Sequence, residues 1–328
     1  MVRQSFSAAA VPTVSVVVPT FNCLDYLPHA LASVLGQGLE AIEVVVIDDG
    51  STDGSWPWLQ QAAETEPRLR VLRTSHLGPA GARNLGIDRA RGQLVAFIDA
   101  DDVWMPGKLE RQLRFHRQYP TMTLSFGNYR QVDESSNELG AGFDAWQHFR
   151  RIAYSESGYR LLPRAAAVLF AENPVGTSTA MVRRDVLQRI GGFDESLPSA
   201  EDWDLWLRLA AQGSVGFTDA PSATYRVRVG SETSKSDARF AALDIIYDRY
   251  AAMAAADPVA PRIARARFAA ARAQHHREHG QYARSLVEHL RAFTIHPSRR
   301  ALHAASVDAR HLLFGRRFRL HPPRTPSI

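Results

Sequence analysis

The feature that most constrains the fold is a set of short apolar runs, rich in β-branched residues, that alternate with stretches of helical periodicity. The apolar runs cover residues 14–18, 43–47, 70–72 and 94–98, and the helical stretches between them cover residues 24–35, 53–64 and 81–90. Apolar strands that alternate with helices are typical of a parallel sheet covered on both faces. We therefore expect an α/β fold with a mostly parallel sheet flanked by helices.

Length and cysteine content limit the class of protein. A chain of 328 residues is long enough for two domains of ordinary size. Its single cysteine, Cys23, excludes an intramolecular disulfide framework and a cysteine-based zinc cluster, and it fits a reducing compartment. The apolar run at residues 14–18 is too short for the hydrophobic part of a signal peptide or for a bilayer span. No other apolar segment is long enough to span a bilayer. We expect a soluble protein.

A break in charge predicts the domain boundary. From residue 236 onward sixteen Arg stand against seven acidic residues, a net charge of +9, so the first 235 residues carry −4 of the total of +5. We predict four segments: an N-terminal arm at 1–11, an α/β domain at 12–235, an Ala- and Arg-rich helical region at 236–315 and a disordered tail at 316–328.

Two of the predicted strands, the second and the fourth, run directly into acidic residues. These are Asp48 and Asp49 after the second strand, and Asp99, Asp101 and Asp102 after the fourth. The carboxyl ends of parallel strands meet at one edge of a sheet, where ligands bind. A single Asp there would only cap the next helix, but several carboxylates repel one another unless a cation joins them. The pattern therefore predicts a metal ion or a basic ligand at this edge.

Other nucleotide-binding and metal-binding motifs are missing or misplaced. Residues 36–41 spell the Gly-x-Gly-x-x-Ala pattern, but they follow a helix and precede a strand, which is the wrong context for a pyrophosphate-binding turn. The sequence holds no Gly-x-x-x-x-Gly-Lys-Ser/Thr loop and no His-Glu-x-x-His motif. We therefore reject these three types of site.

Several segments, in the same order along the chain, resemble the motifs of family 2 glycosyltransferases of the GT-A fold. They are Val14-Ser-Val-Val-Val-Pro-Thr-Phe-Asn22, Val46-Ile-Asp-Asp-Gly-Ser-Thr-Asp53, Gly78-Pro-Ala-Gly-Ala-Arg-Asn-Leu-Gly86, Phe97-Ile-Asp-Ala-Asp-Asp102, Thr177-Ser-Thr-Ala-Met-Val-Arg-Arg184, Gly191-Gly-Phe-Asp-Glu195 and Ala200-Glu-Asp-Trp-Asp-Leu-Trp-Leu-Arg208. The likeness covers roughly residues 12–234. It implies the Rossmann-like GT-A fold for this part of the chain, which the α-helical C-terminal region follows.

The resemblance also implies which residues bind a nucleotide-sugar donor. The matched positions are Pro19, Phe21, Asn22, Asp49, Arg83, Asn84, Asp99, Ala100, Asp101 and Arg228. Asp49 matches the carboxylate that contacts the base, where it would accept the imide proton of uracil or thymine. Its alternative role is to form the turn after the strand, a role that Asp48 could hold instead. The Arg83 guanidinium would suit a phosphate or a carboxylate through forked hydrogen bonds, or would otherwise be an exposed helix residue.

Asp99-Ala-Asp101 resembles the family's DxD motif. The resemblance implies that Asp101 ligates a divalent cation and that Asp99 reaches the ribose or a metal-bound water, so both belong to the predicted metal site. Oxygen ligands and phosphates suit Mn²⁺ or Mg²⁺, which would offset charge on the departing diphosphate. Arg228 stands where related enzymes often have His, and Arg cannot ligate a cation. Either Arg228 holds the diphosphate directly or the metal has fewer protein ligands, which leaves strict metal dependence open.

Asp202 matches the family's catalytic base, which takes the proton of the acceptor hydroxyl. The resemblance implies that Glu201 and Trp203 bind the acceptor beside it, whereas Trp206 is expected in the core. The pattern Ser199-x-x-Asp202 is also that of a capping box at the start of a helix, and the two roles are compatible. A carboxylate at a helix N-terminus is held in its ionised form, the form in which a base accepts a proton.

These features predict an inverting glycosyltransferase. It would move a sugar from a UDP- or dTDP-linked donor to a hydroxyl of a saccharide or glycolipid acceptor in the synthesis of cell-surface polysaccharide or glycoconjugate. A sugar-phosphate nucleotidyltransferase is the alternative enzyme, but it normally carries a Gly-rich, Arg-containing loop where this chain has Pro19-Thr-Phe-Asn22. A non-catalytic scaffold is the second alternative, which the intact acidic residues Asp99, Asp101 and Asp202 disfavour.

The Arg-rich C-terminal region predicts the remaining partners. Its basic helices suit anionic lipid or a membrane-bound acceptor, so we expect a cytoplasmic protein in peripheral contact with the inner face of the cell membrane. A merely solvated helical face is the alternative, and the region could also support an oligomer. Nucleic acid is not expected, because aromatic residues are not interleaved with the arginines.

Overall fold

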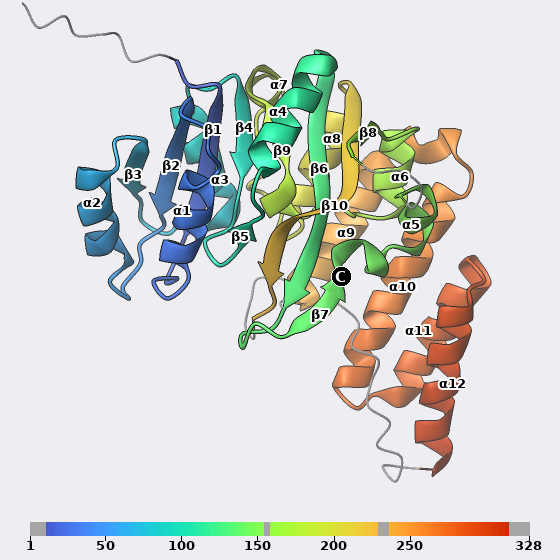
Figure 1. Ribbon diagram of the computed structural model, residues 1–328. Helices are drawn as coiled ribbons and strands as arrows, with labels where there is room; N and C mark the ends of the chain where they lie inside the picture. The colour runs from blue at the N-terminus through green and yellow to red at the C-terminus, as the bar shows by residue number, and fades with distance from the viewer. Residues whose placement is uncertain (1–10, 154–157, 229–235, 315–328) are drawn as a thin grey trace, which may run out of the picture.

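The N-terminal half of the sheet is built as the sequence predicts. The computed structural model describes residues 11–153, 158–228 and 236–314. Its first four strands are parallel neighbours in the order β3-β2-β1-β4, with one helix between each consecutive pair (Figure 1). In chain order the elements are β1 (Val14–Thr20), α1 (Leu27–Leu35), β2 (Ile42–Asp48), α2 (Ser55–Thr65), β3 (Leu69–Arg73), α3 (Gly78–Arg89) and β4 (Leu94–Phe97). Almost every residue of β1 and β2 is buried, which explains why these strands are apolar on both faces.

The second half of the sheet contains one reversed strand. The short strand β9 lies between β4 and β6 and is antiparallel to both, while β10 is parallel to β6. The carboxyl ends of β1, β2, β4, β6 and β10 therefore share one edge. The bounds are β5 (Val103–Trp104), β6 (Met122–Val132), β7 (Glu138–Ala141), β8 (Arg160–Leu161), β9 (Met181–Arg183) and β10 (Ser214–Arg226). The predicted α/β class is confirmed, with a mixed sheet flanked by helices.

The remaining helices cover the faces of this sheet and form the C-terminal region (Figure 1). They are α4 (Lys108–Gln118), α5 (Gln147–Ala153), α6 (Ala165–Ala171), α7 (Arg184–Ile190), α8 (Glu201–Ala210), α9 (Ser236–Tyr250), α10 (Ala260–Glu278), α11 (Tyr282–Ile295) and α12 (Arg299–Phe314), with a 3-10 turn at Thr177–Thr179. None of the helices in the described ranges is long and apolar enough to cross a bilayer.

One helix start differs from the predicted cap. The N-cap of α8 is Ala200, so the predicted capping box is wrong in its position: Ser199 is not the N-cap, and Asp202 instead accepts a hydrogen bond from the backbone N–H of Trp203 in the first turn. The N-cap of α2 is Gly54, at a φ of 94° that glycine adopts without strain. The Ser51 hydroxyl before α2 accepts a hydrogen bond from the backbone N–H of Asn22.

The first two C-terminal helices share the main hydrophobic core. Leu243 and Ile246 of α9, and Ile263 and Phe268 of α10, belong to the same buried cluster as Phe97 of β4. By contrast, α11 and α12 pack mainly on α10 and on each other, through small alanine side chains. The predicted boundary at residue 236 stays a prediction, and the predicted arm and tail lie almost entirely outside the described residues.

Candidate active site

The two aspartates after β2 hold the neighbouring loops. Asp48 is fully buried, accepts a hydrogen bond from the Ser51 backbone N–H at 3.3 Å and lies 3.2 Å from Arg73 Nε. The Asp49 carboxylate accepts hydrogen bonds from the backbone N–H groups of Leu77 at 2.6 Å and Gly78 at 2.8 Å, at the start of α3. Asp48 therefore holds the turn, as the alternative foresaw, and both oxygens of Asp49 are engaged by backbone amides.

An exposed aromatic pair lies beside Asp49. Phe21 is 45% exposed, and its ring centroid is 4.9 Å from that of His76, whose Nδ1 lies 3.8 Å from Asp49 Oδ2. Asn22 adopts a φ of 50°, and its side-chain oxygen accepts a hydrogen bond from the Thr52 backbone N–H at 2.8 Å. Among the predicted donor residues, Phe21 is thus partly exposed, whereas the Asn22 side chain bonds to the loop that contains Thr52. Nothing in the sequence singled out His76.

The acidic cluster after β4 divides into one buried and two accessible carboxylates. Asp102 is 1% exposed and accepts hydrogen bonds from the Ser178 hydroxyl and from the Arg226 backbone N–H. The carboxylates of Asp99 and Asp101 are 28% and 17% exposed. Asp102 is therefore part of the scaffold, and the carboxylates of Asp99 and Asp101 remain to contact a ligand. Ala100 between them is buried.

Each accessible carboxylate is paired with a guanidinium. Arg83 Nη2 lies 2.8 Å from Asp99 Oδ1, and Arg228 Nε lies 2.7 Å from Asp101 Oδ2. The Arg228 guanidinium also contacts Cys23 Sγ at 3.6 Å and the face of Tyr26 at 5.3 Å. Burial and the charge of Asp99 raise the pKa of Asp101, while Arg228 opposes that rise. Arg228 therefore lies beside the acidic pair Asp99 and Asp101.

The donor atoms fit a divalent cation that is shared with a ligand. No group of three or more His, Cys, Asp or Glu side chains converges anywhere in the described ranges. Each guanidinium contacts only one oxygen of its carboxylate, so Asp99 and Asp101 each keep a second oxygen. Mg²⁺ is commonly held by one or two carboxylates together with substrate phosphates. These two residues would therefore hold a cation only together with a phosphate ligand.

Arg83 connects the acidic pair to α8. It is 7% exposed, and its second terminal nitrogen, Nη1, lies 2.9 Å from Glu201 Oε1. Its guanidinium also lies 5.4 Å from the ring centroid of Phe193. Burial alone would lower the pKa of Arg83, but the carboxylates of Asp99 and Glu201 outweigh burial and raise it. Arg83 is therefore neither exposed nor free, and it positions two carboxylates.

Asp202 lies next to this chain of ion pairs. Its Oδ1 accepts a hydrogen bond from the Trp203 backbone N–H at 2.6 Å, and its Oδ2 accepts one from the Thr177 hydroxyl at 3.3 Å. Burial and the neighbouring Glu201 raise the pKa of Asp202 to about 6, while Arg83 opposes the rise. Asp202 is thus mostly ionised at pH 7, with a pKa close to that of an effective general base at neutral pH.

Two predicted site residues serve the scaffold instead. Trp203 is 2% exposed, packs beside Phe170 and Phe268, and donates its indole N–H to the Leu169 carbonyl at 2.7 Å. The prediction that Trp203 binds the acceptor is therefore wrong for this conformation, because the ring has no exposed face. Trp206 is fully buried, as expected.

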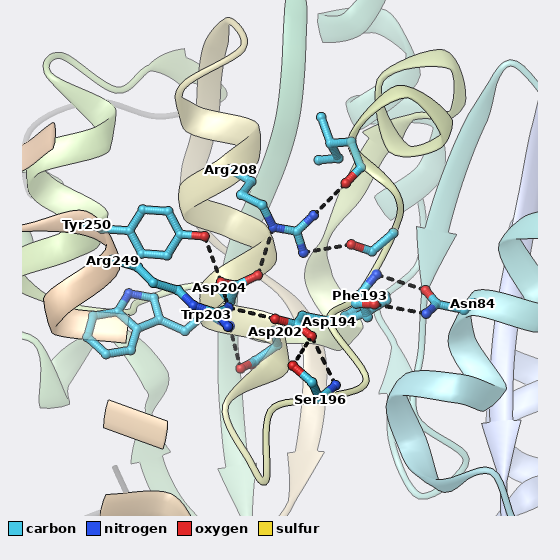
Figure 2. Close-up of polar contacts among 12 residues, drawn as sticks. Asn84, Phe193, Asp194, Ser196, Asp202, Trp203, Asp204, Arg208, Arg249 and Tyr250 are labelled. Carbon is cyan, nitrogen blue, oxygen red and sulfur yellow. Dashed lines mark hydrogen bonds and ion pairs between the residues drawn. The ribbon is translucent and has the colours of Figure 1, made fainter. Parts of the chain in front are cut away.

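Asn84 also has a structural role. Its side-chain amide exchanges two hydrogen bonds with the backbone of Phe193 (Figure 2). The amide also donates a hydrogen bond to Glu195. The amide is thus engaged by the segment before α8 and joins α3 to it. The expected role of Asn84 in donor binding stays a prediction.

A buried polar network fixes the start of α8, and the sequence motifs did not reveal it. The fully buried Asp204 accepts hydrogen bonds from Arg208 Nε at 2.7 Å, from the Tyr250 hydroxyl at 2.7 Å and from Arg249 at 3.2 Å (Figure 2). Arg249 also lies 2.6 Å from Asp194, a carboxylate whose pKa falls to about 2 through hydrogen bonds from Ser196 and Arg249. Helix α9 is thus bonded directly to the helix that carries Asp202.

The chain is similar to known glycosyltransferases in sequence. Residues 15–191 match the family model described as Glycosyl transferase family 2. An "Uncharacterized glycosyltransferase" of Rickettsia felis is 30% identical over 223 residues, which are 67% of this chain and 34% of that protein. The chondroitin synthase of Escherichia coli is 27% identical over 210 residues, covering 64% of this chain and 28% of that protein. The chain thus spans about a third of the length of these curated relatives.

Solved structures show the same fold. A crystal structure of Staphylococcus aureus TarS 1-349 in complex with UDP-GlcNAc superposes with a TM-score of 0.61 at 19% identity, over 90% of this chain and 88% of that one. The mannosyltransferase PcManGT of Pyrobaculum calidifontis, in complex with GDP-Man and Mn²⁺, gives a TM-score of 0.62 at 21% identity, over 97% and 83%. The expected GT-A fold is confirmed.

Proposed function

Because the chain belongs to glycosyl transferase family 2, we propose that it transfers a sugar, with inversion, from a nucleoside-diphosphate donor to a hydroxyl of a growing saccharide or glycolipid. The observation that carries the proposal is the ion-pair chain from Asp99 through Arg83 to Glu201, next to Asp202. Around one guanidinium it brings together the carboxylates that we propose for the donor side and, next to them, the one that we propose as the general base. The relative named chondroitin synthase supports a role in polysaccharide synthesis.

The proposed donor site lies along the carboxyl edge of the sheet. The exposed ring of Phe21 and its neighbour His76 offer a stacking surface for a nucleobase. Pro19, at the half-buried end of β1, and the loop that Asn22 and Asp49 hold together would shape this pocket. A uridine nucleotide is the first candidate because TarS was crystallised with UDP-GlcNAc, and a dTDP-linked sugar is the second.

Asp99 and Asp101 would hold a Mn²⁺ or Mg²⁺ ion jointly with the donor diphosphate. When bound, the ion would neutralise charge on the leaving group. Arg228 lies at Asp101, so its guanidinium would contribute positive charge at the same place. The PcManGT complex, which contains Mn²⁺, supports this choice of metal.

Asp202 would act on the acceptor. As the acceptor oxygen bonds to the anomeric carbon from the face opposite the diphosphate, its hydroxyl proton passes to the Asp202 carboxylate. The bond between the anomeric carbon and the diphosphate oxygen breaks, and the diphosphate departs with the electron pair. Glu201 would help position the acceptor, since it lies beside Asp202 and keeps one oxygen that Arg83 does not contact.

The proposal includes the place in the cell where the protein acts. We propose that the chain acts in the cytoplasm, in peripheral contact with the inner face of the cell membrane. The Arg-rich C-terminal helices would supply this contact, and self-association through them is a second possible role.

A thermal-shift screen of nucleotide sugars with and without Mn²⁺ tests the donor, because a ligand that binds only the folded state raises the melting temperature. The best donor is then used in hydrolysis and transfer assays. We expect Asp101→Ala to abolish the effect of Mn²⁺ and Asp202→Asn to abolish transfer, whereas Asp88→Asn, at an exposed position of α3, changes neither. A chain that no nucleotide sugar stabilises, and that neither hydrolyses nor transfers one, would overturn the proposal.

A further inference from the structure

The first turn of α8 carries the proposed base, and its backbone is strained where the helix begins. The N-cap Ala200 has a φ of 56°, in the left-handed region that residues other than glycine seldom adopt. Asp202 accepts one hydrogen bond from the adjacent Trp203 backbone and a long one, of 3.3 Å, from the Thr177 hydroxyl. A strained backbone persists only where the surrounding structure holds it. The position of Asp202 therefore depends on the contacts that hold this turn.

The end of α9 holds this turn through Asp204, which is fully buried. One oxygen of the Asp204 carboxylate accepts hydrogen bonds from the Tyr250 hydroxyl at 2.7 Å and from Arg249 Nη1 at 3.2 Å. Its other oxygen accepts one from Arg208 Nε at 2.7 Å (Figure 2). Because Asp204 lies two positions after Asp202 in the same turn, these bonds tie the turn that carries the base to α9.

The same residues also hold the loop that precedes α8. Arg249 Nη1 lies 2.6 Å from Asp194 Oδ2, so a single nitrogen bridges a carboxylate before the turn and one within it. Arg208 donates two further hydrogen bonds at the beginning of this loop, to the carbonyls of Ile190 at 2.9 Å and Gly192 at 2.7 Å. The loop, the first turn of α8 and the end of α9 therefore form one bonded unit.

The charges of this unit favour a positioning role over ligand binding. It contains two carboxylates, Asp194 and Asp204, and two guanidiniums, Arg208 and Arg249. These four charges cancel, so they leave no surplus charge for a ligand. A buried ion network adds little stability beyond that of apolar side chains of equal size, but it can fix one geometry.

We propose that Arg249 and Tyr250 are positioning residues, which hold Asp202 at the acceptor hydroxyl by fixing the first turn of α8. The inference rests on the proposed function, because it takes Asp202 as the base. It gives α9 a role in the reaction itself, in addition to the membrane contact proposed for the C-terminal helices. A shift of about 1 Å in a reacting group can lower a rate by about 10²-fold, so a small movement of this turn is measurable.

Steady-state kinetics of the full chain test this role. We expect Arg249→Met/Tyr250→Phe to lower the kcat of transfer by about tenfold or more and to leave the KM for the donor unchanged. Both changes are made together because the Arg249 side chain is 39% exposed, and water screens the loss of its charge. Arg249→Lys should keep most of the wild-type kcat, because one nitrogen makes both contacts with the carboxylates.

Arg272→Met/Tyr282→Phe is the matched control, since it makes the same two changes in the helices that follow α9. Arg272 also lies near two carboxylates, Asp244 at 3.7 Å and Glu288 at 3.8 Å. The Tyr282 ring stacks on another ring, that of His311, at 4.6 Å. This variant should keep the wild-type kcat.

Three outcomes separate the inference from the alternatives, with circular dichroism at the assay temperature to show that each variant is folded. If Arg249→Met/Tyr250→Phe is unfolded, Tyr250→Phe alone, which removes one hydroxyl, should lower kcat by about threefold at unchanged donor KM. A folded variant with the wild-type kcat would overturn the inference, and so would a fall in kcat matched by an equal rise in donor KM. A wild-type chain that transfers no sugar would instead overturn the proposed function.

Discussion

Arg228 Nε lies 2.7 Å from Asp101 Oδ2, so a fixed positive charge lies on the carboxylate that would hold the metal. The same carboxylate is crowded by Asp99, and the guanidinium of Arg228 relieves part of that repulsion. A cation at Asp101 would have to share the carboxylate with Arg228. Metal affinity in this chain should therefore be lower than the carboxylate pair alone would provide.

Replacing Arg228 by His should strengthen metal binding. The change removes a competing charge and adds an imidazole, which can ligate Mn²⁺. We expect Arg228→His to lower the Mn²⁺ dissociation constant by about tenfold, measured by calorimetry in the presence of the nucleoside diphosphate. Arg228→Gln is the matched control, because it removes the charge without adding a ligand and should give a smaller gain. Unchanged Mn²⁺ affinity in both variants would show that Arg228 does not compete with the metal.

Asp202 should control the pH dependence of transfer. Its carboxylate must be ionised to accept a proton, and its pKa is about 6. We expect kcat/KM to rise with pH below about 6 and to level off above it. Asp202→Asn should lower kcat by about 10²- to 10⁴-fold, the usual contribution of a general base. A variant that keeps the wild-type rate, or a wild-type profile without a change near pH 6, would contradict this assignment.

Asp202→Asn should also stabilise the fold at neutral pH. The folded state keeps the Asp202 proton up to a pKa of about 6, whereas the unfolded chain releases it near the ordinary value of 3.8. This group therefore stabilises the fold below pH 4 relative to higher pH, and that contribution is lost as pH rises to about 6. At pH 7.5 we expect the Asn variant to gain about 1 to 3 kcal/mol, measured by urea denaturation, with no gain at pH 3.5. A gain of equal size at both pH values would not be electrostatic in origin.

Arg83 should be essential to both stability and activity. Removing its charge leaves Asp99 and Glu201 unpaired in a largely buried site, which typically costs about 3 to 5 kcal/mol. We expect Arg83→Met to lower the free energy of unfolding by that amount and to abolish transfer. The double variant Arg83→Met/Glu201→Gln should recover part of the stability, because one unpaired carboxylate is gone. Full additivity of the two changes would show that the 2.9 Å contact contributes nothing.

The positions of residues at strand ends could be predicted from the sequence, because the local pattern alone puts such residues at the edge of the sheet. Asp99 and Asp101 follow an apolar strand, and they lie at the shared edge of the sheet as expected. The role of the neighbouring Asp102 depends on hydrogen-bond partners that are distant in the sequence. Asp102 is engaged by Ser178 and by the backbone of Arg226, 76 and 124 positions away in the chain. Only the resemblance to the DxD motif, and no local physical pattern, separates Asp102 from Asp99 and Asp101.

The same reason explains why Trp203 was misassigned. A Trp next to a catalytic carboxylate is compatible with sugar binding, and only the packing of α6 and α10 around it shows that it is buried.

Lys108 should be a site where a substitution stabilises the protein. Its side chain is fully buried, and within the described part of the chain its Nζ has no hydrogen-bond partner and lies 3.9 Å from the ring centroid of Trp104. Burial, with a smaller contribution from Arg111, holds the pKa of Lys108 well below its ordinary value. The folded state therefore releases a proton that the unfolded chain keeps, and the resulting penalty disappears only as pH approaches 10.5.

We expect Lys108→Met, a change of similar volume, to add about 1 to 3 kcal/mol to the free energy of unfolding at pH 7. The gain should shrink between pH 8 and pH 10.5, which urea denaturation at several pH values would measure. Arg117→Met, at an exposed position of the same helix, is the control and should show no such pH dependence. A destabilised Lys108→Met variant would mean that the Lys108 ammonium is paired in solution.

Truncation from the C-terminus should show which C-terminal helices the main core requires. We expect the core to require α9 and α10 but not α11 and α12. Removal of α9 and α10 takes Leu243, Ile246, Ile263 and Phe268 out of the main core, and each large apolar side chain contributes about 1.5 to 3 kcal/mol. A fragment of residues 1–235 should therefore be unfolded. A fragment of residues 1–280 should fold and bind the donor nucleotide, because it keeps both helices that share the main core. Circular dichroism would show whether each fragment is folded, and calorimetry would show whether it binds the nucleotide.

A folded 1–235 fragment that binds nucleotide as well as the full chain would contradict this prediction. It would show instead that the predicted boundary at residue 236 separates two independent units.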